Sequence, residues 1–311
     1  MRKHSPLFYQ WKGRILHSGI HIFSHIRLLV RWVFYSVLMG CVMGLIGVAF
    51  VYAIQYATAW RKNFPWLLAL LPVGGLLIVW LYRITKDQND RGTNMVLASI
   101  RSEARLPVQM APLIFISTVV THLCGGSAGR EGAALQLGGS IGSMFGRLFR
   151  MQERDKHVMI LCGMSAAFSA IFRTPIAAPV FAMEVVCVGA MHYPALVPST
   201  IASLTASWLA GKLGIPLAKF SVQEIPPLQI VPSLKILLLG VLCAGVSVLF
   251  CILLHQTEKQ LHSRVQNPYL RILAASGMIW ILFLLVRNQD YLGIGTDVIG
   301  RALAGDAVWY A

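Results

Sequence analysis

Long apolar stretches separated by short charged segments dominate this sequence. Five stretches without any charged residue are bounded by Arg31 and Arg61, Lys62 and Arg83, Arg105 and Arg130, Glu184 and Lys212, and Lys235 and Glu258. A helix that crosses a bilayer needs about 20 mainly apolar residues. Several of these stretches are long enough, so the pattern predicts an all-α polytopic membrane protein.

The apolar stretches fall into two classes by length. Those expected to span are Trp32–Trp60, Trp66 to about Tyr82, Leu234–Leu254 and the shorter Arg271–Val286, and Tyr193–Ala210 is a further long run. Those that are short and end in glycine, proline or charge are Leu106–Cys124, Gly132–Phe149, Val158–Phe172 and Pro175–Gly189. Short segments of this kind favour broken or half-spanning helices over simple spans.

A second half of the chain repeats the pattern of the first. With an offset of 203 positions, Leu234–Leu254 falls on Arg31–Val51 and Arg271–Val286 falls on Leu68–Arg83. The pair Gly295-Thr296 then falls on Gly92-Thr93. Internal repeats with interrupted helices at matching places are typical of transporters.

The repeat also sets the expected domain organisation. We expect a basic N-terminal tail at 1–28, a first transmembrane repeat at 29–212, a linker at 213–232 and the start of a second repeat at 233–311. The counterpart of Glu131 would lie near position 334, beyond Ala311. The expectation is therefore a C-terminally truncated chain whose second repeat is incomplete.

Composition and charge support a membrane location. The 311 residues are 56% hydrophobic and only 13% charged, whereas soluble domains carry about 25% charged residues. The net charge of +15 is concentrated in short loops and the N-terminal tail, as the positive-inside rule requires, which places the N-terminus in the cytoplasm. Nucleic acid is therefore not an expected partner. We also do not expect the tail to be a removable signal peptide, because it has no short apolar core ending in a small-residue cleavage site.

The six cysteines lie within or beside apolar stretches and include no CxxC pair, so we expect buried packing residues. Neither a metal site nor a cofactor is indicated.

Three glycine-containing loops precede expected helices. They are "RGTNM" (Arg91–Met95) before a helix near Val96, "GGSAGREG" (Gly125–Gly132) before a helix near Ala133, and "YLGIGTD" (Tyr291–Asp297). Backbone N–H groups at the start of a helix, together with the helix dipole, form an anion site without a full buried charge. The alternative is that the glycines only allow close helix packing.

Glu131 lies in the second of these loops. A carboxylate beside an anion site competes with the anion for the same N–H donors, and protonation removes that competition. One side chain can thus couple anion movement to proton movement. The alternative is a structural Arg130–Glu131 pair, although adjacent residues on a helix rarely face each other.

Two longer motifs extend this interpretation. "GREGAALQLG" followed by "CGMSAAFSAIFRTPIAAPVFAMEVV" (Cys162–Val186) resembles the CLC family of chloride channels and anion/proton exchangers. The resemblance implies an inverted-repeat bundle of full and broken helices, a homodimer in the bilayer, and Glu131 as the proton-coupled gating residue. It also implies anion-binding positions at Gly92, Thr93, Asn94, Met95, Gly129, Arg130, Gly132 and Ala133.

Details of the motifs are similar to one branch of that family. Gly92-Thr93-Asn94-Met95 resembles the fluoride/proton antiporters, in which methionine replaces the serine of chloride-selective members. Val185 stands where chloride/proton exchangers carry a second glutamate. Ala133 departs from the Thr or Val usual in the fluoride branch. The resemblance implies fluoride export coupled to proton entry in a bacterial-type inner membrane, with chloride channel or chloride/proton exchange as the alternative.

Two rival functions and three further side chains complete the candidates. Gly125–Gly129 fits the G-x-S-x-G pattern, so a membrane serine hydrolase would use Ser127 with a base such as His192. A transport-inactive family member that modifies a longer relative is the other rival.

We expect His122 to be a packed neutral histidine rather than a proton relay. Arg173 is either an anion attractor or an interfacial residue, and Glu184 is either structural or functional.

Overall fold

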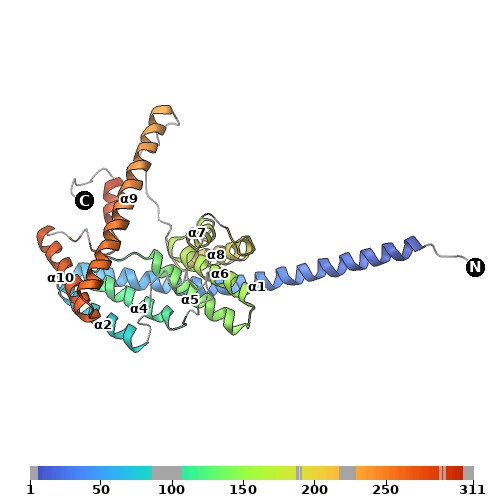
Figure 1. The fold of residues 1–311 in the computed structure, drawn as a ribbon, viewed down its shortest axis with the longest axis horizontal. Coiled ribbons are helices and arrows are strands. Elements are labelled where there is room, and N and C mark those ends of the chain that lie inside the picture. Colours follow the sequence, from blue (N-terminus) through green and yellow to red (C-terminus); the bar gives the residue numbers. More distant parts are fainter. Residues whose placement is uncertain are drawn as a thin grey trace, which may run out of the picture. The chain divides into compact units, whose positions relative to one another are not determined.

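The computed structural model describes residues 6–85, 107–186, 189, 191–216, 229–286, 289 and 292–303. Every regular element in these ranges is a helix (Figure 1). The elements are α1 (Pro6–Asn63), η1 (Pro65–Leu70), α2 (Leu71–Ile84), α4 (Met110–Leu123), α5 (Glu131–Leu148), α6 (Glu153–Phe172), α7 (Ala177–Val186), α8 (Tyr193–Lys212), α9 (Ile230–Arg264), α10 (Pro268–Val286) and α11 (Thr296–Leu303).

The chain forms two compact units. Unit 1 comprises Met1–Tyr52, Asp90–Phe115 and Glu131–Leu217. Unit 2 comprises Ala53–Asn89, Ile116–Arg130 and Ala218–Ala311. Each unit is therefore built from segments that are far apart in the sequence.

Within the described ranges, five segments are long and apolar enough to cross a membrane: Ile26–Asn63, Pro65–Ile84, Glu153–Phe172, Ile230–Arg264 and Pro268–Val286. Four of them were expected from hydropathy. The exception is α6, which was expected to be a short segment starting at Val158 but has 20 residues. It starts earlier because Glu153 and Asp155 lie in its first turn, where acidic side chains stabilise the positive end of the helix dipole.

Shorter helices lie among these long ones, as the sequence predicts. Helices α4, α5 and α7 have 14, 18 and 10 residues. The expected helix near Val96 lies outside the described residues. The segment expected as a linker, 213–232, is described only at its ends, and α9 already begins at Ile230.

Helices α5 and α6 in unit 1 pack at very short range through glycines. A Cβ atom added to Gly142 would lie 2.6 Å from the carbonyl oxygen of Met159 and 2.8 Å from the Cα atom of Ile160. Gly138 and Gly163 face each other in the same way. Small residues let membrane helices approach until their backbones touch. This contact fixes α5 against the buried helix α6.

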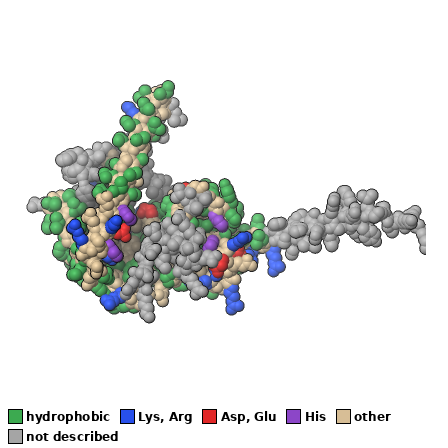
Figure 2. Space-filling view, viewed as in Figure 1, with side chains coloured by type: hydrophobic (Ala, Val, Ile, Leu, Met, Phe, Trp, Pro, Cys, Tyr) green, Lys and Arg blue, Asp and Glu red, His purple; other side chains and the backbone are tan. Residues whose placement is uncertain are grey.

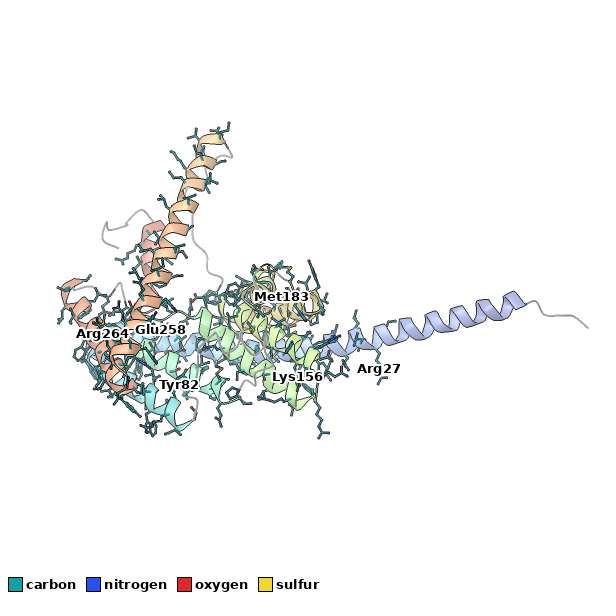
Figure 3. The ribbon with its side chains drawn as sticks, in the orientation of Figure 1. Arg27, Tyr82, Lys156, Met183, Glu258 and Arg264 are labelled. Carbon is teal, nitrogen blue, oxygen red and sulfur yellow. The ribbon has the colours of Figure 1, made fainter. Side chains whose placement is uncertain are left out.

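Hydroxyl groups join α6 to α8 in the same unit. The Ser169 hydroxyl donates to the carbonyl oxygen of Ser203 at 2.9 Å, and the Ser203 hydroxyl donates to the Pro175 carbonyl at 2.8 Å. Helix α6 ends at Phe172. The next residue, Arg173, has a left-handed backbone, and its guanidinium donates to the Ser207 carbonyl. On α7, Met183 is almost completely buried (Figure 3).

Unit 2 contains a pair of helices that the 203-residue offset identifies as counterparts. Helix α10 packs on α2, with Ile272 against Gly75. The Trp280 indole donates to the Leu68 carbonyl at 2.9 Å. Beside this pair, a small core contains Leu68, Leu71, Cys124 and Leu292, with Val120, Ile279 and Phe283 packed against it.

Helix α9 presents its apolar side chains at the surface of unit 2. None of its most apolar window is buried, although its mean hydropathy there is 2.9. Figure 2 shows hydrophobic side chains along much of the helix that Figure 1 labels α9. A bilayer solvates such a surface, so this exposure agrees with a spanning helix.

Candidate functional site

Helix α5 begins at Glu131, two residues before the position expected from the sequence. Glu131 is exposed in the first turn, Gly132 is half-buried and Ala133 is buried. The first four N–H groups of an α-helix have no partner within the helix. The start of α5 therefore combines backbone donors, the positive end of a helix dipole and a carboxylate that can compete for those donors.

The rest of unit 1 holds this helix start in place. The glycine contacts with α6 fix the axis of α5, and the Ser140 hydroxyl donates to the Pro107 carbonyl at 2.9 Å. Pro107 follows the segment that contains Gly92–Met95. Those four predicted anion-binding residues lie outside the described residues. Of the predicted positions, the structure describes Gly129 to Ala133, which run consecutively from the loop into α5.

The glycine-rich loop Gly125–Arg130 belongs to unit 2, where it meets a second loop. Gly125 has φ of 85°, a conformation that disfavours side chains. The Ser127 hydroxyl donates to the Gly293 carbonyl at 3.3 Å. Gly293 and Gly295, both also at positive φ, precede α11. This second loop is the one that the sequence suggested from "YLGIGTD".

No pattern in the sequence pointed to Arg61 as a functional residue. It is 3% exposed, and its Nη2 atom lies 3.4 Å from the Leu292 carbonyl oxygen, to which it donates. Its Cδ atom would lie 3.4 Å from a Cβ atom on Gly125. In the sequence Arg61 only bounds an apolar stretch, next to the exposed Lys62.

The remaining candidates have clearer structural environments. Glu184 on α7 accepts a hydrogen bond from the Gly189 N–H at 2.9 Å. This contact supports the structural role of Glu184, which binds the backbone that follows α7. His122 is completely buried, as expected. Ser127 donates its hydroxyl proton to a backbone carbonyl, whereas a nucleophilic serine donates to a base.

Within the described residues, no group of three or more His, Cys, Asp or Glu gathers as metal ligands.

Comparison with known proteins agrees with this arrangement. Residues 74–311 match the family described as voltage gated chloride channel. A chloride/fluoride channel protein of Pseudomonas syringae pv. tomato is 28% identical over 267 residues, which cover 86% of this chain and 59% of that protein. The H(+)/Cl(-) exchange transporter ClcA of Citrobacter koseri is 31% identical over 165 residues, 48% of this chain and 35% of the transporter. The chain thus spans less than two thirds of these relatives.

Solved structures show the same fold. The crystal structure of a CLC-type fluoride/proton antiporter matches with a TM-score of 0.85 and 31% identity, over 90% of this chain and 71% of that one. A slow cyanobacterial Cl-/H+ antiporter matches with a TM-score of 0.67 and 19% identity, over 79% of this chain and 62% of that one, which supports the fold alone. The resemblance inferred from the G-R-E-G motif is confirmed: this chain is a multi-pass membrane protein that belongs to the voltage-gated chloride channel family.

Proposed function

We propose that this protein moves small inorganic anions across a membrane as a secondary transporter, and that it exports fluoride in exchange for entering protons. The observation that carries the proposal is the position of Glu131 as the first residue of α5. An anion and a carboxylate share one set of donors there, so only one of them occupies it at a time.

Proton coupling follows from the chemistry of that competition. An ionised Glu131 occupies the donors, and a protonated Glu131 releases them to the anion. A proton taken up on one side and lost on the other is then exchanged for an anion. The exposure of Glu131 permits this uptake.

Fluoride is the first choice of substrate for two reasons. The segment Gly92–Met95 resembles that of the fluoride/proton antiporters, because Met95 stands where chloride-selective members of the family carry a serine. The relative from Pseudomonas syringae is described as a chloride/fluoride channel protein, and the antiporter with the matching structure is a fluoride/proton antiporter. Similarity to ClcA favours chloride/proton exchange as the second candidate.

The protein acts as a homodimer in a bacterial inner membrane, with its basic N-terminus in the cytoplasm. The partners are fluoride or chloride, protons and the lipid bilayer.

Flux measurements in proteoliposomes test the proposal. The purified 311-residue chain is reconstituted, and fluoride release is followed with an electrode while proton uptake is followed with a pH-sensitive dye. We expect fluoride release faster than chloride release, accompanied by proton uptake. In Glu131→Gln, which cannot ionise, proton uptake stops.

Glu153→Gln is the matched control, because Glu153 is also an acidic residue in the first turn of a helix but forms an exposed ion pair with Lys156. It should transport as the wild type does. Unchanged proton uptake in Glu131→Gln would refute the proposed coupling. Chloride release faster than fluoride release would select the second candidate, and absence of flux from inserted protein would show an inactive family member.

A further inference from the structure

Helix α9 in unit 2 is longer than a bilayer requires. Its 35 residues span about 50 Å, whereas the hydrocarbon core of a bilayer is about 30 Å thick. The run without charge between Lys235 and Glu258 is the part that fits this core. The polar end of the helix, His255–Arg264, therefore lies at the level of the lipid headgroups.

Two other helix ends of unit 2 lie at the same level. Helix α2 ends at Ile84, α10 begins at Pro268, and these two helices pack together. The Arg83 guanidinium lies over the Tyr269 ring, 5.9 Å from its centre. Tyrosine is enriched at membrane interfaces because its ring is apolar and its hydroxyl polar. The ends of α2, α9 and α10 therefore reach one membrane surface.

Cationic side chains outnumber acidic ones at this surface. Lys259, Arg264 and Arg271 carry positive charges, and Glu258 is the one acidic residue from His255 to Arg271. Figure 3 labels Glu258 and Arg264 at this end of α9, and Figure 2 shows Lys, Arg and His side chains near it. An excess of Lys and Arg at one end of a span is typical of its cytoplasmic side, where anionic lipids give a negative surface potential.

A hydrogen bond between α9 and α10 orients one of these cations. The Arg271 Nη1 atom lies 2.6 Å from the His262 Nδ1 atom. Arginine can only donate, so Nδ1 accepts and the imidazole proton is on Nε2. A guanidinium has five N–H donors, so Arg271 retains donors that match two oxygens of a phosphate. Lys259 is three residues before His262 and therefore shares its face of α9.

Exposed apolar side chains adjoin the cations on both helices. Leu254, just before the polar end of α9, is 53% exposed, and Leu273, two residues after Arg271, is 39% exposed. A phospholipid has both parts that this surface requires, a phosphate for the cations and acyl chains for the leucines. A free phosphate would contact only the cations.

We propose that Lys259, His262, Arg264 and Arg271 bind the phosphate of an anionic phospholipid, whose acyl chains lie along α9 and α10. The net positive charge favours an anionic headgroup over a zwitterionic one, whose own cation is repelled. This lipid site goes beyond the proposed anion exchange at Glu131 and does not depend on it.

Native mass spectrometry of the purified chain in detergent tests the proposal. The protein is mixed with equal amounts of phosphatidylglycerol and phosphatidylcholine that have the same acyl chains, and we expect it to retain phosphatidylglycerol. A Lys or Arg near a membrane surface contributes about fivefold to the binding of anionic lipid, so the double variant Lys259→Gln, Arg271→Gln should bind it more than about tenfold more weakly. Equal retention of the two lipids by the wild type would overturn the proposal.

Lys235→Gln is the matched control, because Lys235 is an exposed cation on the same helix but lies beyond the apolar run. It should bind phosphatidylglycerol as the wild type does, and an equal loss in this variant would show attraction by net charge without a site. Lys259→Gln alone, on the exposed surface of α9, should lower binding about fivefold without any effect on packing. Arg271→Lys, which keeps the charge, should retain most of the binding.

Inorganic phosphate distinguishes a lipid site from a site for free phosphate. Added to the wild type, it should not displace phosphatidylglycerol, because it cannot replace the contacts of the acyl chains. Displacement by inorganic phosphate would overturn the assignment to a lipid. None of these measurements uses flux, so failure of the exchange at Glu131 and failure of the lipid site are distinguished.

Discussion

The glycine contact between α5 and α6 provides a prediction whose size can be worked out from the structure. In Gly142→Ala, the new Cβ atom would lie 2.6 Å from the Met159 carbonyl oxygen and 2.8 Å from the Ile160 Cα atom. Both neighbours are backbone atoms, so they cannot rotate away. The two helices must separate, and overpacking of this kind costs about 1–3 kcal/mol.

The same substitution also has a favourable contribution. Alanine is better than glycine in a helix interior by about 1 kcal/mol. Gly240→Ala on α9 isolates this contribution, since a Cβ atom there would have no atom within 4 Å. The difference between the two variants therefore reports the steric cost alone, and we expect Gly142→Ala to be about 1–3 kcal/mol less stable than Gly240→Ala.

Thermal unfolding in detergent, followed by loss of the monodisperse peak in size-exclusion chromatography, measures this difference. At about 2–4 °C per kcal/mol, the Gly142→Ala transition should lie several degrees below that of Gly240→Ala. Equal transition temperatures would refute the close α5–α6 contact, and with it the explanation of how the start of α5 is held.

Three smaller predictions concern other parts of the chain. Gly125→Ala should destabilise unit 2 by about 1–2 kcal/mol, because a residue in the left-handed conformation acquires a Cβ atom. That Cβ atom would also lie 2.8 Å from Leu68 Cδ1. Thermal unfolding of the variant at the wild-type temperature would contradict this prediction. The exposed 3.0 Å ion pair between Arg31 and Asp155 should contribute no more than about 1 kcal/mol to the free energy of unfolding, measured as the coupling energy of a double-mutant cycle. A larger coupling energy would mean that the pair is shielded from solvent. Cys243 and Cys251 are exposed on α9, so the expectation that the cysteines are buried was wrong for these two. Cys243 should resist a membrane-impermeant maleimide in intact membranes and react after denaturation. Labelling of the intact membrane would show that α9 faces water.

Hydropathy alone determined much of this fold. The long apolar stretches predicted α1, α2, α9 and α10, because a helix must have a minimum number of apolar residues to cross the hydrocarbon core of a bilayer. Glycine and charge marked the short helices, and the start of α5 was missed by only two residues. The 203-residue offset related α2 to α10 before the structure showed that they pack together. Family membership was likewise readable from the G-R-E-G motif around Glu131.

The burial of individual polar residues was decided only by the tertiary structure. Arg61 and Lys62 are adjacent and look alike in the sequence, yet Arg61 is buried and Lys62 exposed, because successive residues point in different directions around a helix. The carbonyl oxygen that accepts a hydrogen bond from Arg61 belongs to Leu292, 231 positions away. The sequence also predicted a packed His122, but it did not indicate that neither ring nitrogen has a hydrogen-bond partner among the described residues. A local pattern records which residues can be buried, whereas their partners come from segments that only folding brings together.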